Sequence, residues 1–274
     1  MKNAGAKCRS AVMAGIFYPE EQKAARDALT GLGLGQGPMG CAQAILAPHA
    51  GWDISGTVAA AAFNAAMERK PDTVVMLGPI HGAHETGIYL SDSDSFQTPV
   101  GDLPVDTELC EELSSCSTLM RVNDIPHLYE HSIEVLLPLV KYCFPDAVLV
   151  PILVGGNGAA AAAALPLALD LVFASRMDTT LFVVSTNLSD HLEDEISRAQ
   201  GAEFLRLVEG LDRDGILEGL AAGRISACGA ACAAALLGCR SLSGCGARTV
   251  ARASSGGARS DDPRTVHYAA VAFG

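Results

Sequence analysis

The chain has 274 residues and a formal net charge of −12, with 49% hydrophobic and 18% charged residues. This length is sufficient to bury a large core, and the balance of apolar and charged residues excludes a chain that is disordered throughout. The acidic charge argues against a general nucleic-acid-binding protein, which needs a basic surface to contact phosphates. We therefore expect a globular protein that does not bind nucleic acid.

The start of the chain and its longest apolar stretch favour a cytoplasmic protein with no membrane contact. The apolar run at residues 11–17 is short, leads directly into charged residues and lacks a clear cleavage site. The stretch at residues 159–174 contains Pro166 and Asp170 and is shorter than the ~20 residues that span a membrane, so it is predicted to be a packed helix. Nine cysteines at irregular spacing, with no CxxC pair, indicate reduced thiols rather than a disulfide framework or a zinc knuckle.

Several continuously apolar runs of strand length end in polar or glycine-rich turns. Such runs are typical of strands that are covered on both faces of a sheet. The runs are residues 44–48, 73–79, 147–155 and 180–186. A last strand is predicted at residues 266–273, after a polar loop at residues 251–265.

Segments with helical features lie between these runs. They are residues 55–70, 106–116, 130–144, 197–211 and 226–242, in addition to 159–174. Asp106 is a typical N-cap residue for the second of them. Strands that alternate with helices predict an α/β sandwich around one sheet. No linker divides the chain, so we expect a single domain over residues 1–274.

Histidines follow three of the predicted strands at their carboxyl ends. His49 follows the first run, His81 follows the second, and residues 187–191 follow the run at 180–186. Functional sites of open α/β sheets gather at these ends. One histidine in such a place is ordinarily just a loop residue, but three such exits together predict a site. Glycines beside His49 and His81 allow close approach of a ligand, although neither motif is a phosphate-binding loop.

Two further stretches contain candidate residues for catalysis or metal binding. Glu130 and Glu134 are four residues apart and share one helix face, which is often simply a solvated face. His131, next to Glu130, is a candidate proton carrier because histidine titrates near neutral pH. Cys228 lies near the start of an alanine-rich segment, where a helix N-terminus favours the thiolate; a buried inert thiol is the alternative. A His/His/Cys set would suit zinc, iron or copper and leave an open coordination position.

Nine short motifs occur in order over nearly the whole chain. They are "AGIFYP" (14–19), "APHAGWDISG" (47–56), "VVMLGPIHG" (74–82), "TPVGDLPVD" (98–106), "HLYEHSIEVLLPLV" (127–140), "VPILVG" (150–155), "FVVSTNLSDH" (182–191), "ACG" (227–229) and "HYAAVAF" (267–273). With these motifs the chain resembles the Memo family, whose prokaryotic members are called AmmeMemoRadiSam system protein B. The resemblance implies a three-layer α/β/α sandwich with one central, mostly parallel or mixed sheet, similar to class III extradiol dioxygenases.

The resemblance also implies a metal-binding pocket. The two histidines of the family correspond to His49 and His81, and its cysteine corresponds to Cys228. These are positions that the strand ends and the thiol chemistry also indicate. A metal on these three residues would be accompanied by His131 or His191 as the group that moves protons, with Glu130 beside His131.

One stretch departs from the family pattern. Family members read Ser-Ser-Asp, two further residues and then His, whereas this chain reads "STNLSDH" at residues 185–191. Asn187 stands at the Asp position and is neutral, so it cannot act as a general base. Asp190 stands at the His position and offers a hard oxygen ligand, and His191 is displaced by one residue. Altered or lost activity is therefore one expectation for this chain.

Three functions are compatible with these residues. The first is an iron- or copper-dependent, dioxygenase-like oxidoreductase that acts on an unidentified small molecule. The second is a non-catalytic adaptor on the same fold, since eukaryotic members of the family are described as binding phosphorylated peptides. The third is a zinc-dependent hydrolase, in which the metal activates water. The prokaryotic family name implies a radical-SAM protein and a third protein as partners.

Overall fold

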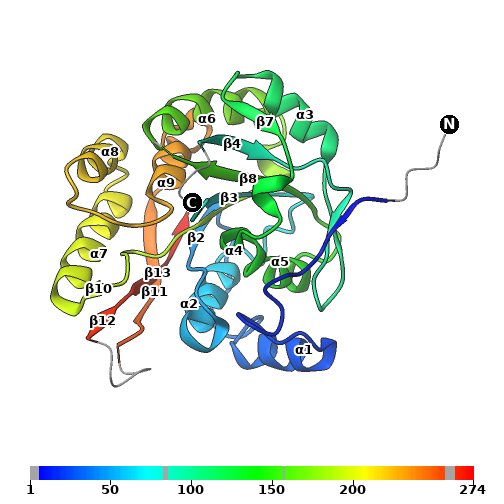
Figure 1. Ribbon diagram of the computed structural model, residues 1–274, viewed down its shortest axis with the longest axis horizontal. Coiled ribbons are helices and arrows are strands. Elements are labelled where there is room, and N and C mark those ends of the chain that lie inside the picture. The colour runs from blue at the N-terminus through cyan, green and yellow to red at the C-terminus, as the bar shows by residue number, and fades with distance from the viewer. Residues whose placement is uncertain (1–5, 83–85, 157, 257–262) are drawn as a thin grey trace.

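The computed structural model describes residues 6–82, 86–156, 158–256 and 263–274. Its main sheet has eight strands in the order β11-β13-β2-β9-β3-β8-β4-β7 (Figure 1). They are β2 (Ala44–Ala47), β3 (Thr73–Pro79), β4 (Gly87–Leu90), β7 (Met120–Val122), β8 (Val148–Gly155), β9 (Thr180–Ser185), β11 (Ala247–Ser254) and β13 (His267–Phe273). The central strands β2, β9, β3 and β8 are parallel to one another, whereas β13 and β4 are antiparallel to β2 and β8. The predicted mixed sheet is therefore confirmed.

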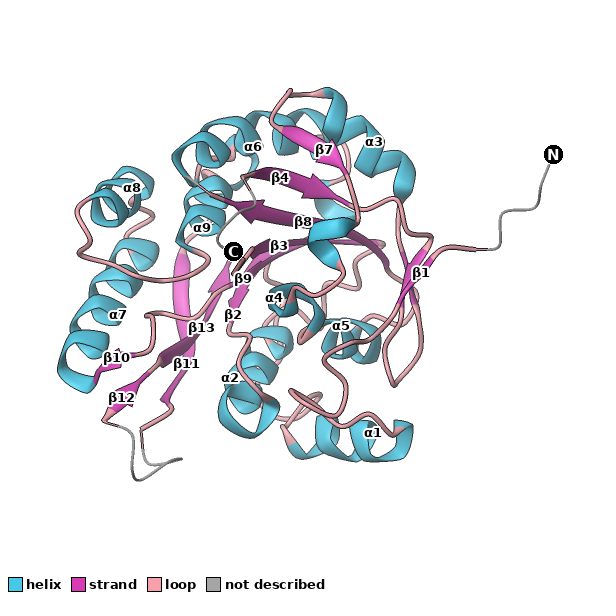
Figure 2. Ribbon diagram, in the orientation of Figure 1, coloured by secondary structure: helices cyan, strands magenta, loops and turns pink. Residues whose placement is uncertain are grey.

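Helices cover both faces of this sheet (Figure 2). They are α1 (Gln22–Gly31), α2 (Trp52–Asn64), α3 (Thr107–Ser115), α4 (His131–Glu134), α5 (Leu137–Cys143), α6 (Gly158–Phe173), α7 (Asp194–Glu209), α8 (Arg213–Ala221) and α9 (Ala230–Leu237). Helices α2 and α4 pack on one side, and α6, α7 and α9 pack on the other. The residues of β2, β3 and β9 are all buried, as expected for strands between two helical layers. The α/β sandwich predicted from the sequence is confirmed.

Two smaller sheets attach loops to this body. Strands β1 (Cys8–Arg9), β5 (Ser95–Phe96) and β6 (Leu103–Pro104) form one of them, and β10 (Leu192–Glu193) pairs with β12 (Arg264–Thr265) in the other. From β1, the buried Arg9 side chain donates a hydrogen bond to the carbonyl of His127 at 2.8 Å and another to that of Glu130 at 3.1 Å. These hydrogen bonds hold the start of the described chain beside α4.

Some predicted elements differ from the observed ones. The helix expected over residues 130–144 is two helices, α4 and α5, and Pro138 lies in the first turn of the second. A proline has no amide hydrogen and cannot continue the hydrogen bonding of a preceding helix, so a new helix begins there. The loop expected over residues 251–265 is wrong for 251–254, which belong to the edge strand β11, and for 264–265, which form β12. Residues 257–262 of this loop lie outside the described part of the chain.

Other local predictions agree with the structure. Asp106 caps α3, because its side chain accepts a hydrogen bond from the amide of Leu109 at 2.9 Å. The alanine-rich stretch at 159–174 forms α6 with Pro166 inside it. Among the described helices, none combines the length and the apolarity that crossing a bilayer requires.

Candidate metal centre

His49 lies two residues after the end of β2 and is fully buried. Its backbone amide donates to Oδ1 of Asn187 at 3.2 Å, just beyond the end of the neighbouring strand β9. Its ring nitrogen Nδ1 lies 2.6 Å from Oγ of Ser185, the last residue of β9. Two adjacent parallel strands therefore fix both the backbone and the ring of this histidine at their carboxyl ends.

His81 follows the next strand, β3, and is held by Glu130. Its Nδ1 donates to Oε1 of Glu130 at 2.9 Å, and its amide donates to Oε2 at 2.7 Å. Burial acts to raise the pKa of Glu130, but the hydrogen bonds and the charge of His81 outweigh it and lower that pKa to about 2. The carboxylate is therefore ionised, so it can only accept hydrogen bonds from the His81 ring.

His131 is the first residue of α4 and stacks on the ring of His81, with centroids 4.3 Å apart. Its other face stacks on Phe17 at 5.0 Å, and its ring stands at 90° to that of His49. Burial, together with the charges of His49 and His81, lowers the pKa of His131 to about 4. The ring is therefore neutral near pH 7, with a nitrogen lone pair available to a metal or a proton.

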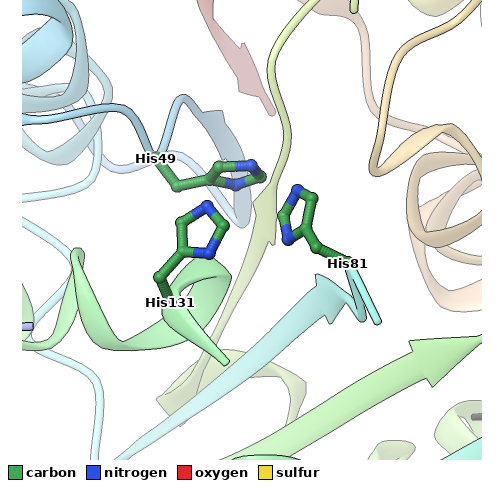
Figure 3. A group of neighbouring side chains, drawn as sticks. All are labelled: His49, His81 and His131. Carbon is green, nitrogen blue, oxygen red and sulfur yellow. The ribbon is translucent and has the colours of Figure 1, made fainter. Parts of the chain in front are cut away.

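The three imidazoles come from three separate elements and point toward one another (Figure 3). Each offers one ring nitrogen, and these nitrogens all lie within 4.8 Å of one another. Nitrogens that share one ion at the usual bond length of about 2.0–2.1 Å cannot be more than about 4.2 Å apart, so small adjustments of the rings suffice. The side chain of His81 is 37% exposed, which leaves the cluster open to solvent on one side. This cluster can bind a metal ion.

Cys228 adjoins the same cluster. Its Sγ lies 3.3 Å from Nε2 of His49 and accepts a hydrogen bond from the amide of Asn187 at 3.3 Å. Burial acts to raise the pKa of the thiol, but the charge and hydrogen bond of His49 and the hydrogen bond of His81 lower it well below its ordinary value. The sulfur is therefore biased toward the thiolate, which is the form that binds metals.

Gly229 allows Cys228 to approach so closely. Gly229 caps the start of α9, and its amide donates to Oγ1 of Thr186 at 2.8 Å. A Cβ atom at this position would lie 2.4 Å from the carbonyl oxygen of Ser185 and 2.5 Å from Cβ of Thr186. Only glycine fits between the start of α9 and the end of β9, which explains the glycine of the "ACG" motif.

The structure thus brings together His49, His81, His131 and Cys228, and it places Glu130 directly behind two of the rings. Asp190 and His191 are exposed on the chain that follows β9. The carboxylate of Asp190 accepts from the amide of His191 at 2.8 Å, and the Asp190 amide donates to Oγ of Ser226 at 3.0 Å. The described contacts of Asp190 therefore shape a turn beside the site.

Sequence reasoning missed residues that support the cluster from outside. Glu134 is not on a solvated face: it is 1% exposed and forms an ion pair with the buried Arg9. The hydroxyl of Tyr18 also donates to Glu134, at 2.6 Å. No local pattern links Arg9 to a glutamate 125 residues away. Tyr18 lies in the "AGIFYP" motif, and that motif was the one available indication of its role.

The fold and the site define a mixed α/β protein with a histidine cluster, able to bind metal, at the carboxyl ends of its strands. A family model described as Memo-like protein matches residues 9–272, so the chain belongs to the Memo-like family. MEMO1 family proteins of Desulfurococcus amylolyticus and Aeropyrum pernix are each 31% identical to it, over 97% of this chain and 99% of theirs. A MEMO1 family protein of Methanosarcina barkeri is 30% identical, over 96% of this chain and 98% of its own.

Proposed function

We propose that this protein is an oxidoreductase that acts on a small molecule. It would bind one transition-metal ion, iron or copper, for this reaction. The observation that carries the proposal is the meeting of three imidazoles and a low-pKa thiol at the carboxyl ends of adjacent strands. Imidazole and thiolate donors suit iron, copper and zinc and do not suit magnesium or calcium. The donor set therefore fits the metal that the family resemblance implies.

Two ligand sets are available for the ion. His49 and His81 are common to both. The third ligand is Cys228, which the sequence predicts, or His131, whose ring nitrogen lies within 4.8 Å of those of the other two histidines. We favour Cys228, because its Sγ is 3.3 Å from Nε2 of His49, close to the ~3.5 Å that separates nitrogen and sulfur ligands of one tetrahedral ion. The ring of His131 then remains free to accept a proton.

Residues around the ion would orient its ligands and transfer protons. When bound, the metal supplies redox chemistry to the substrate. Glu130 orients His81 through its carboxylate, and the neutral ring of His131 takes a proton from the substrate. His191 is a second proposed proton carrier, and Asp190, exposed beside it, is a proposed catalytic residue that offers a hard oxygen ligand. The proposed partners are the substrate and, as the family name implies, a radical-SAM protein and a third protein.

One observation favours a second candidate, a non-catalytic binding module. Asn187 stands where the family has an acid, and its Oδ1 already accepts the amide of His49. An amide in this position preserves the hydrogen bond but cannot take up a proton. The zinc-dependent hydrolase differs from the oxidoreductase only in the ion that the same ligands hold, so the identity of the metal separates those two.

The deciding experiment is elemental analysis of protein purified without oxygen. We expect about one equivalent of iron or copper, lost in His49→Ala and His81→Ala and retained in the control His267→Gln, whose histidine lies on β13 outside the cluster. Stoichiometric zinc would favour the hydrolase, and the absence of any transition metal would favour the binding module. With Co²⁺ as a probe, loss of a thiolate charge-transfer band in Cys228→Ser but not in His131→Gln would identify Cys228 as the third ligand.

A further inference from the structure

The hydrogen bonds behind His49 form a short chain with a defined direction. Oγ of Ser185 lies 2.5 Å from the carbonyl oxygen of Ser132 and 2.6 Å from Nδ1 of His49. A carbonyl oxygen can only accept, so the single hydrogen of the Ser185 hydroxyl points to Ser132. What Ser185 presents to His49 is therefore a lone pair, and Nδ1 of His49 must carry the hydrogen.

The carbonyl of Ser132 is available because α4 is irregular. In a regular α-helix the amide of Leu136 would bond to the carbonyl of Ser132, four residues earlier. Here that amide bonds to the carbonyl of Ile133 at 3.1 Å. Ser132 is also held on both sides, since its amide donates to Glu130 at 2.8 Å and its hydroxyl donates to the carbonyl of Pro79 at 2.7 Å. The acceptor at the end of the chain is thus fixed in place.

Burial of these groups favours one neutral tautomer of His49 over the other. His49, Ser132 and Ser185 are each 0% exposed, so water does not compete for their polar atoms. The alternative tautomer, with hydrogen on Nε2, would let that nitrogen donate to Sγ of Cys228, but it would set the lone pair of Nδ1 against the lone pair of Ser185 at 2.6 Å and leave that buried contact without a hydrogen. A neutral imidazole carries one hydrogen, so placing it on Nδ1 leaves Nε2 with a free lone pair.

We infer that Ser185 is a positioning residue that fixes the tautomer of His49 and directs the Nε2 lone pair into the metal centre. Nε2 is the atom that lies 3.3 Å from Sγ of Cys228. The inference rests on the proposed function only for its consequence, which is metal affinity. The Nδ1 hydrogen of His81 is also held, but its acceptor at 2.9 Å is the carboxylate of Glu130. The ring of His49 is thus oriented by the neutral hydroxyl of Ser185, and the ring of His81 by the charged carboxylate of Glu130.

The tautomer can be read directly from imidazole ¹⁵N chemical shifts in metal-free protein at alkaline pH, with the His49 signal assigned by its loss in His49→Gln. We expect hydrogen on Nδ1 in the native chain. In Ser185→Ala we expect a mixture or the Nε2 form, together with an affinity for Co²⁺ or Cu²⁺ weakened about tenfold or more. Ser185→Thr, which retains the hydroxyl, should keep the native tautomer.

The matched control is Ser197→Ala, which removes an equally buried hydroxyl whose partner is Ser189 at 2.6 Å. It should change neither the spectrum of His49 nor the metal affinity. Hydrogen on Nε2 in the native chain would overturn the inference, even if Ser185→Ala failed to fold. An unchanged spectrum in a folded Ser185→Ala would overturn it too. If the native chain binds no metal, the proposed function fails and the spectrum still decides the tautomer.

Discussion

Arg9 and Glu134 form an ion pair in which the two side chains are only 2% and 1% exposed. Glu134 ends α4, the helix that begins with His131 and is capped by Glu130. The ion pair therefore joins the first described strand to the helix that supplies one imidazole and the carboxylate behind another. Because neither charge can reach water, removal of one partner leaves the other buried and uncompensated.

Glu134→Gln should destabilise the fold by about 3–5 kcal/mol, since the charge of Arg9 would remain buried without its partner. The measurement is the free energy of unfolding in urea. The control is Lys23→Ala, which removes the exposed i,i+4 pair between Lys23 and Asp27 and should change stability by no more than about 0.5 kcal/mol. Equal effects of the two substitutions would show that the buried pair contributes no more to stability than an exposed pair does.

A pH dependence of stability follows from His127, which lies behind the same helix. Burial lowers the pKa of His127 to about 4, and its Nε2 bonds to the carbonyl of Tyr89 at 3.2 Å. The unfolded chain binds a proton on this residue below about pH 6.5, whereas the folded chain does so only near pH 4. The contribution of His127 should therefore lower the stability by about 3 kcal/mol as the pH decreases between these values, and this contribution should stay constant below them.

Unfolding in urea at a series of pH values between 7 and about 4 tests this dependence. His131 titrates in the same range, because its pKa is also lowered to about 4, so the comparison must be made between variants. His127→Gln should remove the contribution of His127 from the dependence of the unfolding free energy on pH and leave that of His131. His131→Gln should remove the contribution of His131 and leave that of His127. A His127→Gln curve parallel to that of the native chain would contradict the assignment.

The fold was largely predictable from the sequence because its central strands are buried on both sides. The runs at 73–79 and 180–186 are apolar at nearly every position and emerge as β3 and β9 within one residue. The convergence of His49 and His81 could be predicted for the same reason, since the carboxyl ends of neighbouring parallel strands share one edge. These features depend on local sequence and on a general rule of sheet topology.

What could not be predicted depends on contacts between distant segments. In the sequence, Arg9 and Glu134 look like surface charges. Only the folded chain shows that they form a buried ion pair. The role of Ser185 depends on an irregular helix turn that frees the carbonyl of Ser132. Strand β11 is half-exposed and lies at the edge of the sheet, so it lacks the continuous apolar run that identifies central strands.

The thiol of Cys228 should ionise at a lower pH than an ordinary cysteine thiol in the metal-free protein. Burial alone would raise its pKa, but the hydrogen bonds and charge from His49 and His81 lower it well below the ordinary value. The difference in ultraviolet thiolate absorbance between the native chain and Cys228→Ser should therefore persist to a lower pH than the absorbance of an ordinary cysteine thiolate. In His49→Ala the same difference should appear only at higher pH. Cys232→Ser serves as control, because burial raises the pKa of Cys232.

The close packing at Gly229 predicts a sharp effect of a single methyl group. In Gly229→Ala the new Cβ would meet the carbonyl oxygen of Ser185 at 2.4 Å, so the segment that carries Cys228 must move away from β9. We expect roughly 1–3 kcal/mol of destabilisation from overpacking. We also expect metal affinity to fall at least tenfold, because Cys228 would be displaced from His49.

The comparison for this substitution is Gly31→Ala at the end of α1, where a Cβ would meet nothing within 4 Å. That variant should fold with unchanged or slightly increased stability, since alanine loses less entropy than glycine in a helix. Metal affinity is measured by titration with Co²⁺ and stability by urea unfolding in both variants. If Gly229→Ala bound Co²⁺ as tightly as Gly31→Ala and showed the same thiolate band, the position of Cys228 would not depend on the absence of a side chain at Gly229, and the packing argument would be wrong.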